Sequence, residues 1–368
     1  MHELPRPAPA AGPTICLVLH AHQPPNVSDA EIEQTVRCVY QPVLAAHAAL
    51  GAPLTLNVQG CLLQRLGSIA PAFVERLRDL MHGKLIEFTA SAHYHPCLPL
   101  LPRERRKRQI ALNLRTQQQV LQIHPSGFWP PELAWTPALA EQLDELGLRW
   151  TIADGSAFLR AWDLADAPLG EPRAVYLPAE LTRPYLLASA PGVTVVPRQH
   201  EWSRQLFEDG ALADTEKLSA SIAAMRMQAH GLICLATDAE RISPETLRTY
   251  ERLVRELSEF SELVTTTTAV KKYPAEHSID LPVWTWRGAL DEWIRGEGER
   301  SFLRELDDAH RRRADLAVRS RDVVLAEAVD DSLMQAECSC WLFWRTPCRF
   351  LAEGFARIGR AHKIMDSM

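Results

Sequence analysis

The chain has 368 residues, of which 46% are apolar and 23% are charged, and its formal net charge is −6 at pH 7. This length suits one large barrel domain with a smaller appendage, and the acidic balance argues against nucleic acid as a partner. No apolar run approaches the roughly 18 residues of a membrane span, which argues against a membrane protein.

The eight cysteines are scattered and form no C-x-x-C pair, so their pattern does not indicate a zinc ribbon. Several lie in apolar strand-like runs and are interpreted as buried free thiols. Residues 1–14 are rich in Pro and Ala, lack the apolar core of a signal peptide, and are expected to form a flexible lead. Together these features predict a protein of the reducing cytoplasm.

Beyond residue 14, apolar and β-branched runs alternate with helical patterns, which predicts a parallel sheet. The runs lack polar alternation, so the strands are expected to be buried on both faces, and seven or eight such units favour a closed barrel. An open doubly wound sheet is the alternative, but no glycine-rich phosphate-binding motif supports it. The expected strands are 15–21, 54–60, 85–90, 149–154, 193–197, 232–238 and 263–268, with a short one at 126–130, and the expected helices are 31–50, 67–82, 103–122, 136–147, 212–230 and 244–259.

The end of the chain has a different character. No Gly or Pro occurs from Glu299 to Thr346, which predicts two or three long helices packed against the barrel. One of these helices ends in an aromatic patch, SCWLFW, at 339–344.

Polar side chains gather where the predicted strands end. Parallel barrels build their active sites at the C-terminal ends of their strands, so residues from several ends converge there. One histidine beside a strand is more often a structural residue, but convergence from five strand ends favours a functional site. The polar residues concerned are His20, His22, Glu87, His93, His95, Glu132, Asp154, Asp238 and Glu240.

Glu132 follows a strand that must stop. Pro130 and Pro131 cannot both continue a hydrogen-bonded ladder, so Glu132 is presented just past the strand end. Trp129 and Trp135 flank it, and indole faces beside a carboxylate suit sugar rings. The structural alternative is a helix N-terminus, where Glu132 would complement the helix dipole.

A second carboxylate ends another predicted strand. The run 232–238 finishes in Asp238, and Glu240 follows two residues later. Cleavage of a glycosidic bond needs one group to protonate the leaving oxygen and another to attack or stabilise the oxocarbenium-like centre. A Glu and an Asp on different strands of one barrel meet that demand, whereas the structural alternative is a helix-capping Asp before a solvated Glu–Arg pair.

Several segments agree in order and spacing with one known family. They are HAHQP (20–24), GKLIEFTASAHYHPCLPLL (83–101), GFWPPELAW (127–135) and TDAER (237–241), together with TWRGALDEW (285–293) and AECSCWLFW (336–344), which are similar to helical segments after a barrel. The sequence thus resembles glycoside hydrolase family 57. The resemblance implies that Glu132 is the nucleophile and Asp238 the acid/base, with Glu240 in support.

The resemblance also implies a fold and a chemistry. The implied fold is α/β, an incomplete (β/α)7-type parallel barrel over 15–285 followed by a C-terminal helical bundle over 286–368. The implied activity is that of a retaining hydrolase or transglycosylase acting on α-linked glucans, oligosaccharides or galactosides through a covalent glycosyl-enzyme, with no cofactor and no required metal. The two carboxyl groups of such an enzyme lie roughly 5–5.5 Å apart. The residues expected to bind substrate are His20, His22, Glu87, His95, Trp129, Glu240, Trp341 and Trp344.

One position departs from the family pattern. Where the family has an Asp that helps to hold the site, this chain has Cys340. A neutral thiol lacks the negative charge that would raise the pKa of Asp238, so we expect Asp238 to titrate lower than in relatives. The departure leaves open a catalytically weak or inactive carbohydrate-binding protein.

A metal-dependent hydrolase of the amidohydrolase type is the other open alternative. His20 and His22 would form a ligand pair, with His93 or His95 and Asp238 as further ligands. This interpretation leaves the tryptophan-flanked carboxylate unexplained.

Overall fold

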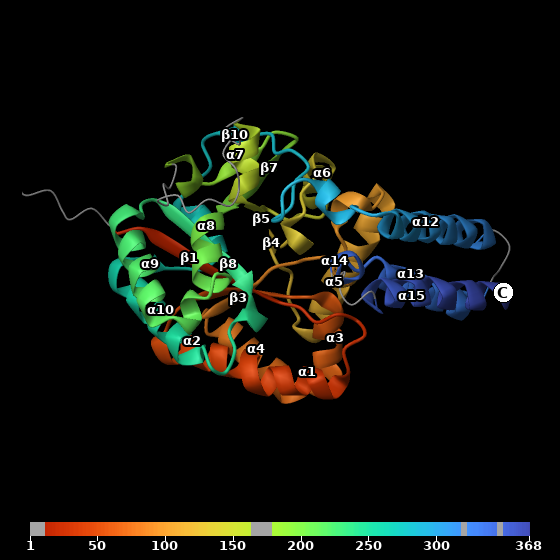
Figure 1. Cartoon of the computed structure of the whole chain (residues 1–368), viewed down its shortest axis with the longest axis horizontal. Coiled ribbons are helices and arrows are strands. Elements are labelled where there is room, and N and C mark those ends of the chain that lie inside the picture. The colour runs from red at the N-terminus through yellow and green to blue at the C-terminus, as the bar shows by residue number, and fades with distance from the viewer. Residues whose placement is uncertain (1–11, 163–178, 318–321, 344–348) are drawn as a thin grey trace, which may run out of the picture.

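The computed structural model describes residues 12–162, 179–317, 322–343 and 349–368. Within this part of the chain, seven parallel strands form a barrel, and helices surround it (Figure 1). The barrel strands are β1 (Thr14–Ala21), β2 (Leu54–Val58), β3 (Ile86–Phe88), β4 (Gly127–Phe128), β5 (Trp150–Asp154), β7 (Ala190–Arg198) and β8 (Leu232–Asp238).

The strands close into a ring in which two neighbouring pairs, β7 with β8 and β3 with β4, are each joined at a single position. β1 lies between β2 and β8, so that His20 is opposite both Asn57 and Asp238. The ring continues from β8 through β7 and β5 to β4. β7 and β8 pair at one position, Arg198 with Cys234, and β4 reaches the end of β3 through a bridge between Phe128 and Ala90. The expected α/β fold with a mainly parallel barrel is confirmed.

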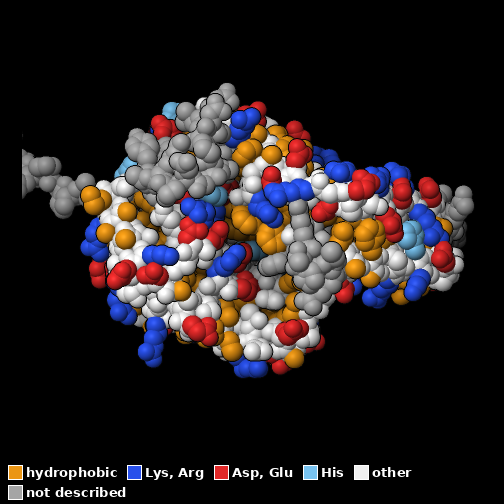
Figure 2. Space-filling view, viewed as in Figure 1, with side chains coloured by type: hydrophobic (Ala, Val, Ile, Leu, Met, Phe, Trp, Pro, Cys, Tyr) orange, Lys and Arg blue, Asp and Glu red, His pale blue; other side chains and the backbone are white. Residues whose placement is uncertain are grey.

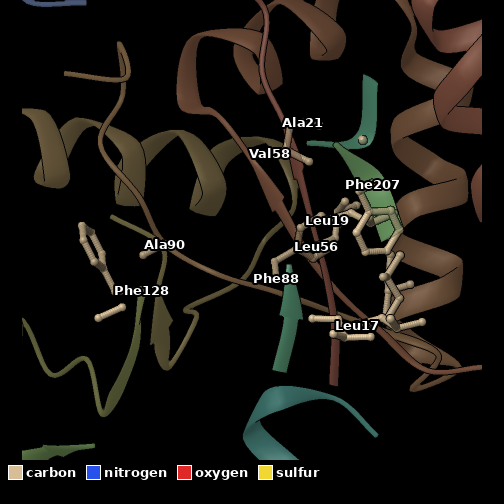
Figure 3. Close-up of a cluster of buried hydrophobic side chains, with 14 of the residues drawn as sticks. Leu17, Leu19, Ala21, Leu56, Val58, Phe88, Ala90, Phe128 and Phe207 are labelled. Carbon is tan, nitrogen blue, oxygen red and sulfur yellow. The ribbon is translucent and has the colours of Figure 1, made fainter. Parts of the chain in front are cut away.

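Alternation along β1 decides which side chains enter the barrel. Leu17 and Leu19 pack outward in the core beneath the helices, together with Leu56 of β2 and Phe207 of α8 (His200–Phe207) (Figure 3). The intervening side chains, Cys16 and Val18, pack inside the barrel. Because side chains alternate along a strand, the next inward position on β1 is His20.

Most of the barrel helices lie where the sequence predicts them. The expected helix 31–50 is divided, because a π-helical turn (Val36–Tyr40) joins α1 (Asp29–Thr35) to α2 (Gln41–Leu50). Besides these and α8, the barrel helices are α3 (Gly60–Ile69), α4 (Pro71–His82), α5 (Arg103–Val120), α6 (Pro137–Glu145), α7 (Gly155–Ala161), α9 (Thr215–Gln228) and α10 (Leu247–Phe260).

The prediction of a strand at 263–268 is wrong for most of its length. Only β9 (Glu262–Leu263) pairs with β1, and α11 (Thr266–Lys272) follows it. A run of β-branched threonines favours a strand locally, but Thr265 caps the helix by accepting from the backbone N–H of Thr268. The tertiary structure therefore overrides the local propensity here.

A small strand pair extends the sheet beside β7. β6 (Tyr185–Leu187) runs antiparallel to β7, and β10 (Ser278–Ile279) pairs with β6. Neither strand can be recognised in the sequence, because each is only two or three residues long.

The C-terminal helices project to one side of the barrel (Figure 1). They are α12 (Glu297–Ala317), α13 (Val323–Ala336), the short α14 (Cys340–Phe343) and α15 (Arg349–Asp366). They enclose a hydrophobic core that includes Phe302, Leu333 and Trp341, and the barrel loops contribute Cys97 and Ala134 to it. This shared core joins the helical segment to the barrel.

Candidate active site

A cavity of about 440 Å³ opens at the C-terminal ends of the barrel strands. It contains the inward residues that end β1, β7 and β8, namely His20, Arg198 and Asp238. Each of these residues continues the inward series of its strand, so the alternation that builds the barrel interior also places them in the cavity. The other side chains that line it include His22, Gln23, His95, Trp129, Glu132, Glu208, Glu240, Arg241, Trp286, Cys340 and Phe343.

Glu132 is held in a strained turn beyond β4. It lies in a single turn of 3₁₀ helix (Pro131–Leu133) with φ 61° and ψ 16°, a left-handed conformation that is uncommon outside glycine. Strain of this kind gathers at functional sites, because the surrounding structure must enforce it. The backbone N–H of Trp286 donates to the carbonyl of Glu132, which helps to fix the turn.

Two side chains orient the Glu132 carboxyl group. The Trp286 indole donates to Oε2 at 2.8 Å, and the Ser339 hydroxyl donates to Oε1 at 2.7 Å. Burial raises the pKa of Glu132 to about 7, while these two hydrogen bonds act in the opposite direction because they favour the carboxylate. Glu132 therefore exchanges a proton close to neutral pH.

Asp238 ends β8 and is exposed to the cavity rather than packed against neighbours. The surrounding protein partly desolvates the carboxyl group and so raises the pKa of Asp238, although His22, Arg241 and Arg198 act in the opposite direction. The charge of Asp238 in turn raises the pKa of Glu132. The two carboxyl groups thus share one cavity and interact electrostatically.

Glu240 anchors the loop after β8. Its carboxylate accepts from the backbone N–H of His22 at 3.0 Å and from the Gln23 amide at 3.3 Å. The hydroxyl of Tyr40, at the end of the π-helical turn, donates to the same oxygen. Burial and the nearby Asp238 raise the pKa of Glu240 to about 7. Glu240 thus links the end of β8 to the end of β1 through hydrogen bonds.

The histidines form a hydrogen-bonded chain that ends at Glu132. The Nδ1 of His20 lies 2.7 Å from Asn57 Oδ1, and its Nε2 lies 2.9 Å from the Nε2 of His95. The Nδ1 of His95 lies 3.0 Å from Ser339 Oγ, which contacts Glu132. Burial lowers the pKa of His20 to about 4 and that of His95 well below its usual range, so both rings are neutral at pH 7.

The indole of Trp129 forms an aromatic wall beside these hydrogen-bonded histidines. Trp129 stacks on His20 with ring centroids 5.2 Å apart, and the rings of His22 and His95 stack at 3.9 Å. The Trp129 side chain is almost fully buried, and its indole nitrogen has no hydrogen-bond partner among the described residues. The indole ring of Trp129 borders the cavity, and such a flat aromatic face is a surface on which a sugar ring can stack.

A family model, described as glycosyl hydrolase family 57, matches residues 17–282. The chain belongs to this family. The match begins at Leu17 within β1, runs past β8 and includes Glu132 and Asp238, so the family resemblance in the sequence is confirmed.

Solved structures of family 57 share this fold. The branching enzyme of Thermococcus kodakaraensis, solved with glucose, superposes with a TM-score of 0.77 at 18% identity, over 96% of this chain and 89% of the other. The α-amylase AmyC of Thermotoga maritima gives a TM-score of 0.72 at 16% identity, over 96% and 93%. At these identities the similarity establishes the fold.

A curated relative is more similar in sequence over a shorter stretch. Alpha-amylase 1 of Dictyoglomus thermophilum is 30% identical over 146 residues, which is 39% of this chain. The match spans about a fifth (21%) of that amylase's length.

Glu87 was expected to bind substrate, but it does not line the cavity that contains Glu132 and Asp238. It faces the barrel interior at the opposite, N-terminal end, where its Oε1 accepts from Thr55 Oγ1 at 2.8 Å and from the backbone N–H of Thr267 at 2.9 Å. It lines a separate cavity with Lys84 and Ser126, residues that precede β3 and β4. Glu87 thus stabilises the N-terminus of α11 at the barrel floor.

The two aromatic residues predicted from the C-terminal patch have other positions. Trp341 is buried in the core of the helical segment, where its indole donates to the carbonyl of Gln335, and it does not line the cleft. It is large and apolar, so core packing accounts for it. Trp344 lies outside the described residues.

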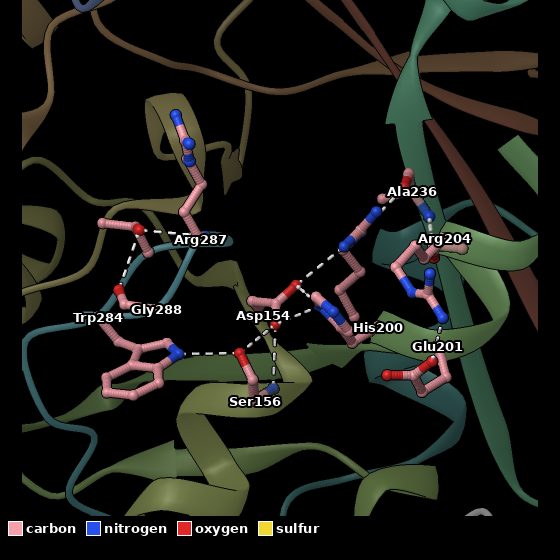
Figure 4. Close-up of polar contacts among 12 residues, drawn as sticks. Asp154, Ser156, His200, Glu201, Arg204, Ala236, Trp284, Arg287 and Gly288 are labelled. Atoms are coloured by element: carbon pink, nitrogen blue, oxygen red, sulfur yellow. Dashed lines mark hydrogen bonds and ion pairs between the residues drawn. The ribbon is translucent and has the colours of Figure 1, made fainter. Parts of the chain in front are cut away.

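Asp154 supports the cleft wall through buried charges. It caps α7 by accepting from the backbone N–H of Ser156, and its carboxylate lies 2.9 Å from both Arg198 and the Nδ1 of His200 (Figure 4). Burial alone would raise the pKa of Asp154, but His200 and Arg198 hold it well below its usual range. Arg198 also contacts Glu208 at 2.9 Å, and both line the cleft.

Trp286 and Ser339 were not predicted as site residues. The segment 285–293 was expected to be helical, but only its end forms a 3₁₀ turn (Leu290–Trp293). A backbone bridge between Trp284 and Trp135 precedes the segment, and Trp286 lines the cleft. Ser339 directly precedes Cys340, so the departure from the family pattern at Cys340 is the signal in the sequence that points to this place. The thiol of Cys340 lies 3.0 Å from the Nε2 of His22, which places the departing residue inside the cleft.

The surface and the helices add two observations. Acidic and basic side chains are interspersed over the face shown in Figure 2. In the described part of the chain, none of the helices combines the length and the apolar character needed to cross a bilayer.

Proposed function

We propose that this family-57 protein is a retaining α-glucan hydrolase or transglycosylase. The observation that carries the proposal is the pair Glu132 and Asp238, which approach one cavity from different barrel strands and sit beside the Trp129 wall. Oriented carboxyl groups beside an aromatic surface are what cleavage of a glycosidic bond requires. The names of the amylase and branching-enzyme relatives support α-glucans as the substrate class.

The reaction proceeds in two displacements. The Glu132 carboxylate attacks the anomeric carbon while Asp238 donates its proton to the leaving glycosidic oxygen, giving a glycosyl ester on Glu132 and one free sugar end. Asp238, now ionised, then removes a proton from water or from a sugar hydroxyl. That oxygen attacks the anomeric carbon, the ester bond breaks and Glu132 is released with the anomeric configuration retained.

The hydrogen-bonded chain links the protonation state of Glu132 to the direction of the Ser339 hydroxyl. With His20 neutral and its Nδ1–H directed at Asn57, its Nε2 accepts from His95, whose Nδ1 then accepts from Ser339, which accepts in turn from protonated Glu132. When Glu132 is ionised, the Ser339 hydroxyl donates to its Oε1 instead, while both rings stay neutral because burial lowers their pKa values. Ser339 thus stabilises the ionised nucleophile inside a buried site.

Product analysis tests the proposal directly. Incubation with maltooligosaccharides or amylose should yield shorter or longer α-glucans whose newly formed ends are initially α-configured by NMR, whereas α-galactosides should be left unchanged. Glu132→Gln and Asp238→Asn should each lower kcat by at least about 10³-fold, since each removes a group that the transition state requires. An initially β-configured product, or near-normal turnover in Glu132→Gln, would refute the proposal.

A metal-dependent hydrolase is less well supported. The ring nitrogens of His20 and His95 are all engaged in hydrogen bonds within the protein, so binding a metal there would break the chain to Glu132.

The cysteines of the described chain are free thiols. A cytoplasmic location stays a prediction that rests on them.

A further inference from the structure

A second group of donor atoms lies beside the cleft, two of them on residues that line it, and the glycosidic mechanism does not use it. Cys338, Cys340 and His22 each offer one ligand atom, and these atoms all lie within 4.8 Å of one another. Both cysteines are almost fully buried, and the Sγ of Cys340 lies 3.0 Å from the Nε2 of His22. α14, which begins at Cys340, lies where the helical segment meets the barrel (Figure 1).

A buried amide presets the imidazole for ligation. The Nδ1 of His22 lies 2.7 Å from the Oε1 of Gln59, a fully buried residue at the end of β2. An amide oxygen can only accept, so Nδ1 carries the proton and the lone pair of Nε2 points at the thiol of Cys340. In metal sites, a ligating histidine is oriented in this way by an acceptor on its other nitrogen.

We propose that Cys338, Cys340 and His22 bind one thiophilic d¹⁰ cation, such as Zn²⁺, with a fourth position open to the cleft. Two thiolates and one imidazole are a ligand set that zinc prefers. In a tetrahedral site, ligand atoms lie roughly 3.5–3.8 Å apart, so side-chain movements on the order of an ångström close this one. Both thiols lose their protons to solvent on binding.

The position of this site predicts its effect. His22 and Cys340 line the same cavity as Glu132 and Asp238, so a bound cation would occupy the wall that a sugar must contact. We therefore expect thiophilic metals to inhibit turnover, an effect that rests on the proposed function. The binding itself does not depend on that function, and the carboxyl groups in the cavity favour a cation electrostatically.

The test is a metal titration of the reduced full-length protein without oxygen. Co²⁺ should bind at one equivalent and give the visible absorption of tetrahedral thiolate ligation, and Zn²⁺ should displace it. Cys338→Ser, Cys340→Ser and His22→Ala should each weaken binding by about 10- to 100-fold. Cys38→Ser removes an exposed thiol elsewhere and is the matched control, which should bind as the unchanged protein does.

The outcomes separate the two proposals. A wild-type spectrum without thiolate-bound tetrahedral Co²⁺ overturns the site without requiring any variant to fold. Binding that survives in Cys338→Ser and Cys340→Ser but disappears in Cys38→Ser overturns it as well. If the protein binds Zn²⁺ as expected but acts on no glycoside, the metal site stands and the glycosidase proposal fails.

Discussion

At the scale of single residues, the chemistry depends on how a few side chains hold Glu132. The sequence predicted Glu132, Asp238 and Glu240 because strand ends, prolines and tryptophans can be recognised locally. It did not predict the hydrogen bond from Trp286, which comes from a segment 154 residues away in the chain. It also misplaced Glu87, because alternation shows that a side chain points inward but not at which end of the barrel it lies.

Removal of the Trp286 indole tests the tuning of Glu132. Its hydrogen bond stabilises the carboxylate and so lowers the pKa of Glu132, which burial raises to about 7. In Trp286→Phe that pKa should rise, and the limb of the kcat/KM profile near pH 7 should move upward by about one pH unit.

A neighbouring tryptophan provides the control for this shift. Trp284→Phe removes an indole that donates to Ser156 and not to Glu132, so the same limb should stay in place. An equal shift in both variants would show that Trp286 acts only through packing.

At the scale of elements, buried charges fix the ends of β5 and β7. Local sequence predicted both strands, but the partners of Asp154 arise only when β7 pairs with β5 and brings Arg198 opposite it. The same limit explains α11: four threonines favour a strand until the barrel floor supplies Glu87 and Thr55 as acceptors for its first N–H groups. Contacts distant in sequence decide both cases.

Asp154→Asn should destabilise the fold strongly. It leaves Arg198 and His200 without their buried partner, and breaking such a pair costs about 3–5 kcal/mol in the free energy of unfolding. Asp144→Asn, at an exposed pair with Arg149, should cost less than about 1 kcal/mol. Urea unfolding measures both, and equal effects would contradict this account.

The same network gives stability a defined pH dependence. The pKa of Asp154 is depressed, so its contribution is present above its unfolded pKa of roughly 3.9 and is lost as the pH falls further. The pKa of His200 is raised, so its contribution is complete below roughly pH 6.5 and is lost as the pH rises through its folded pKa. Asp154→Asn should remove both dependences from the unfolding free energy.

At the scale of the whole molecule, the barrel supplies the carboxyl groups and the C-terminal segment completes their surroundings. Ser339 and Cys340 reach the cleft from that segment, and its core includes Cys97 and Ala134 of the barrel loops. The sequence predicted a barrel followed by long helices, since the periodic patterns are strong in both. It could not predict that the segment from 284 to 288 brings Trp286 to the cleft, because that path depends on pairing with Trp135.

Deletion of 297–368 should therefore abolish cooperative folding as well as activity. The cut exposes the shared apolar core and removes the serine that orients Glu132. Thermal unfolding followed by circular dichroism should lose its sharp transition. A soluble truncated barrel with a sharp transition would show that the helical segment is an independent module.

The central claim is that Glu132 forms a covalent bond to the sugar. A fluorinated α-glucosyl fluoride that glycosylates quickly and hydrolyses slowly should trap this ester, and mass spectrometry of proteolytic peptides locates it. The account predicts one sugar per chain on the peptide that contains Glu132, and none in Glu132→Gln. A label on Asp238 or Glu240 instead, or continued turnover of α-glucan without any labelled peptide, would contradict it.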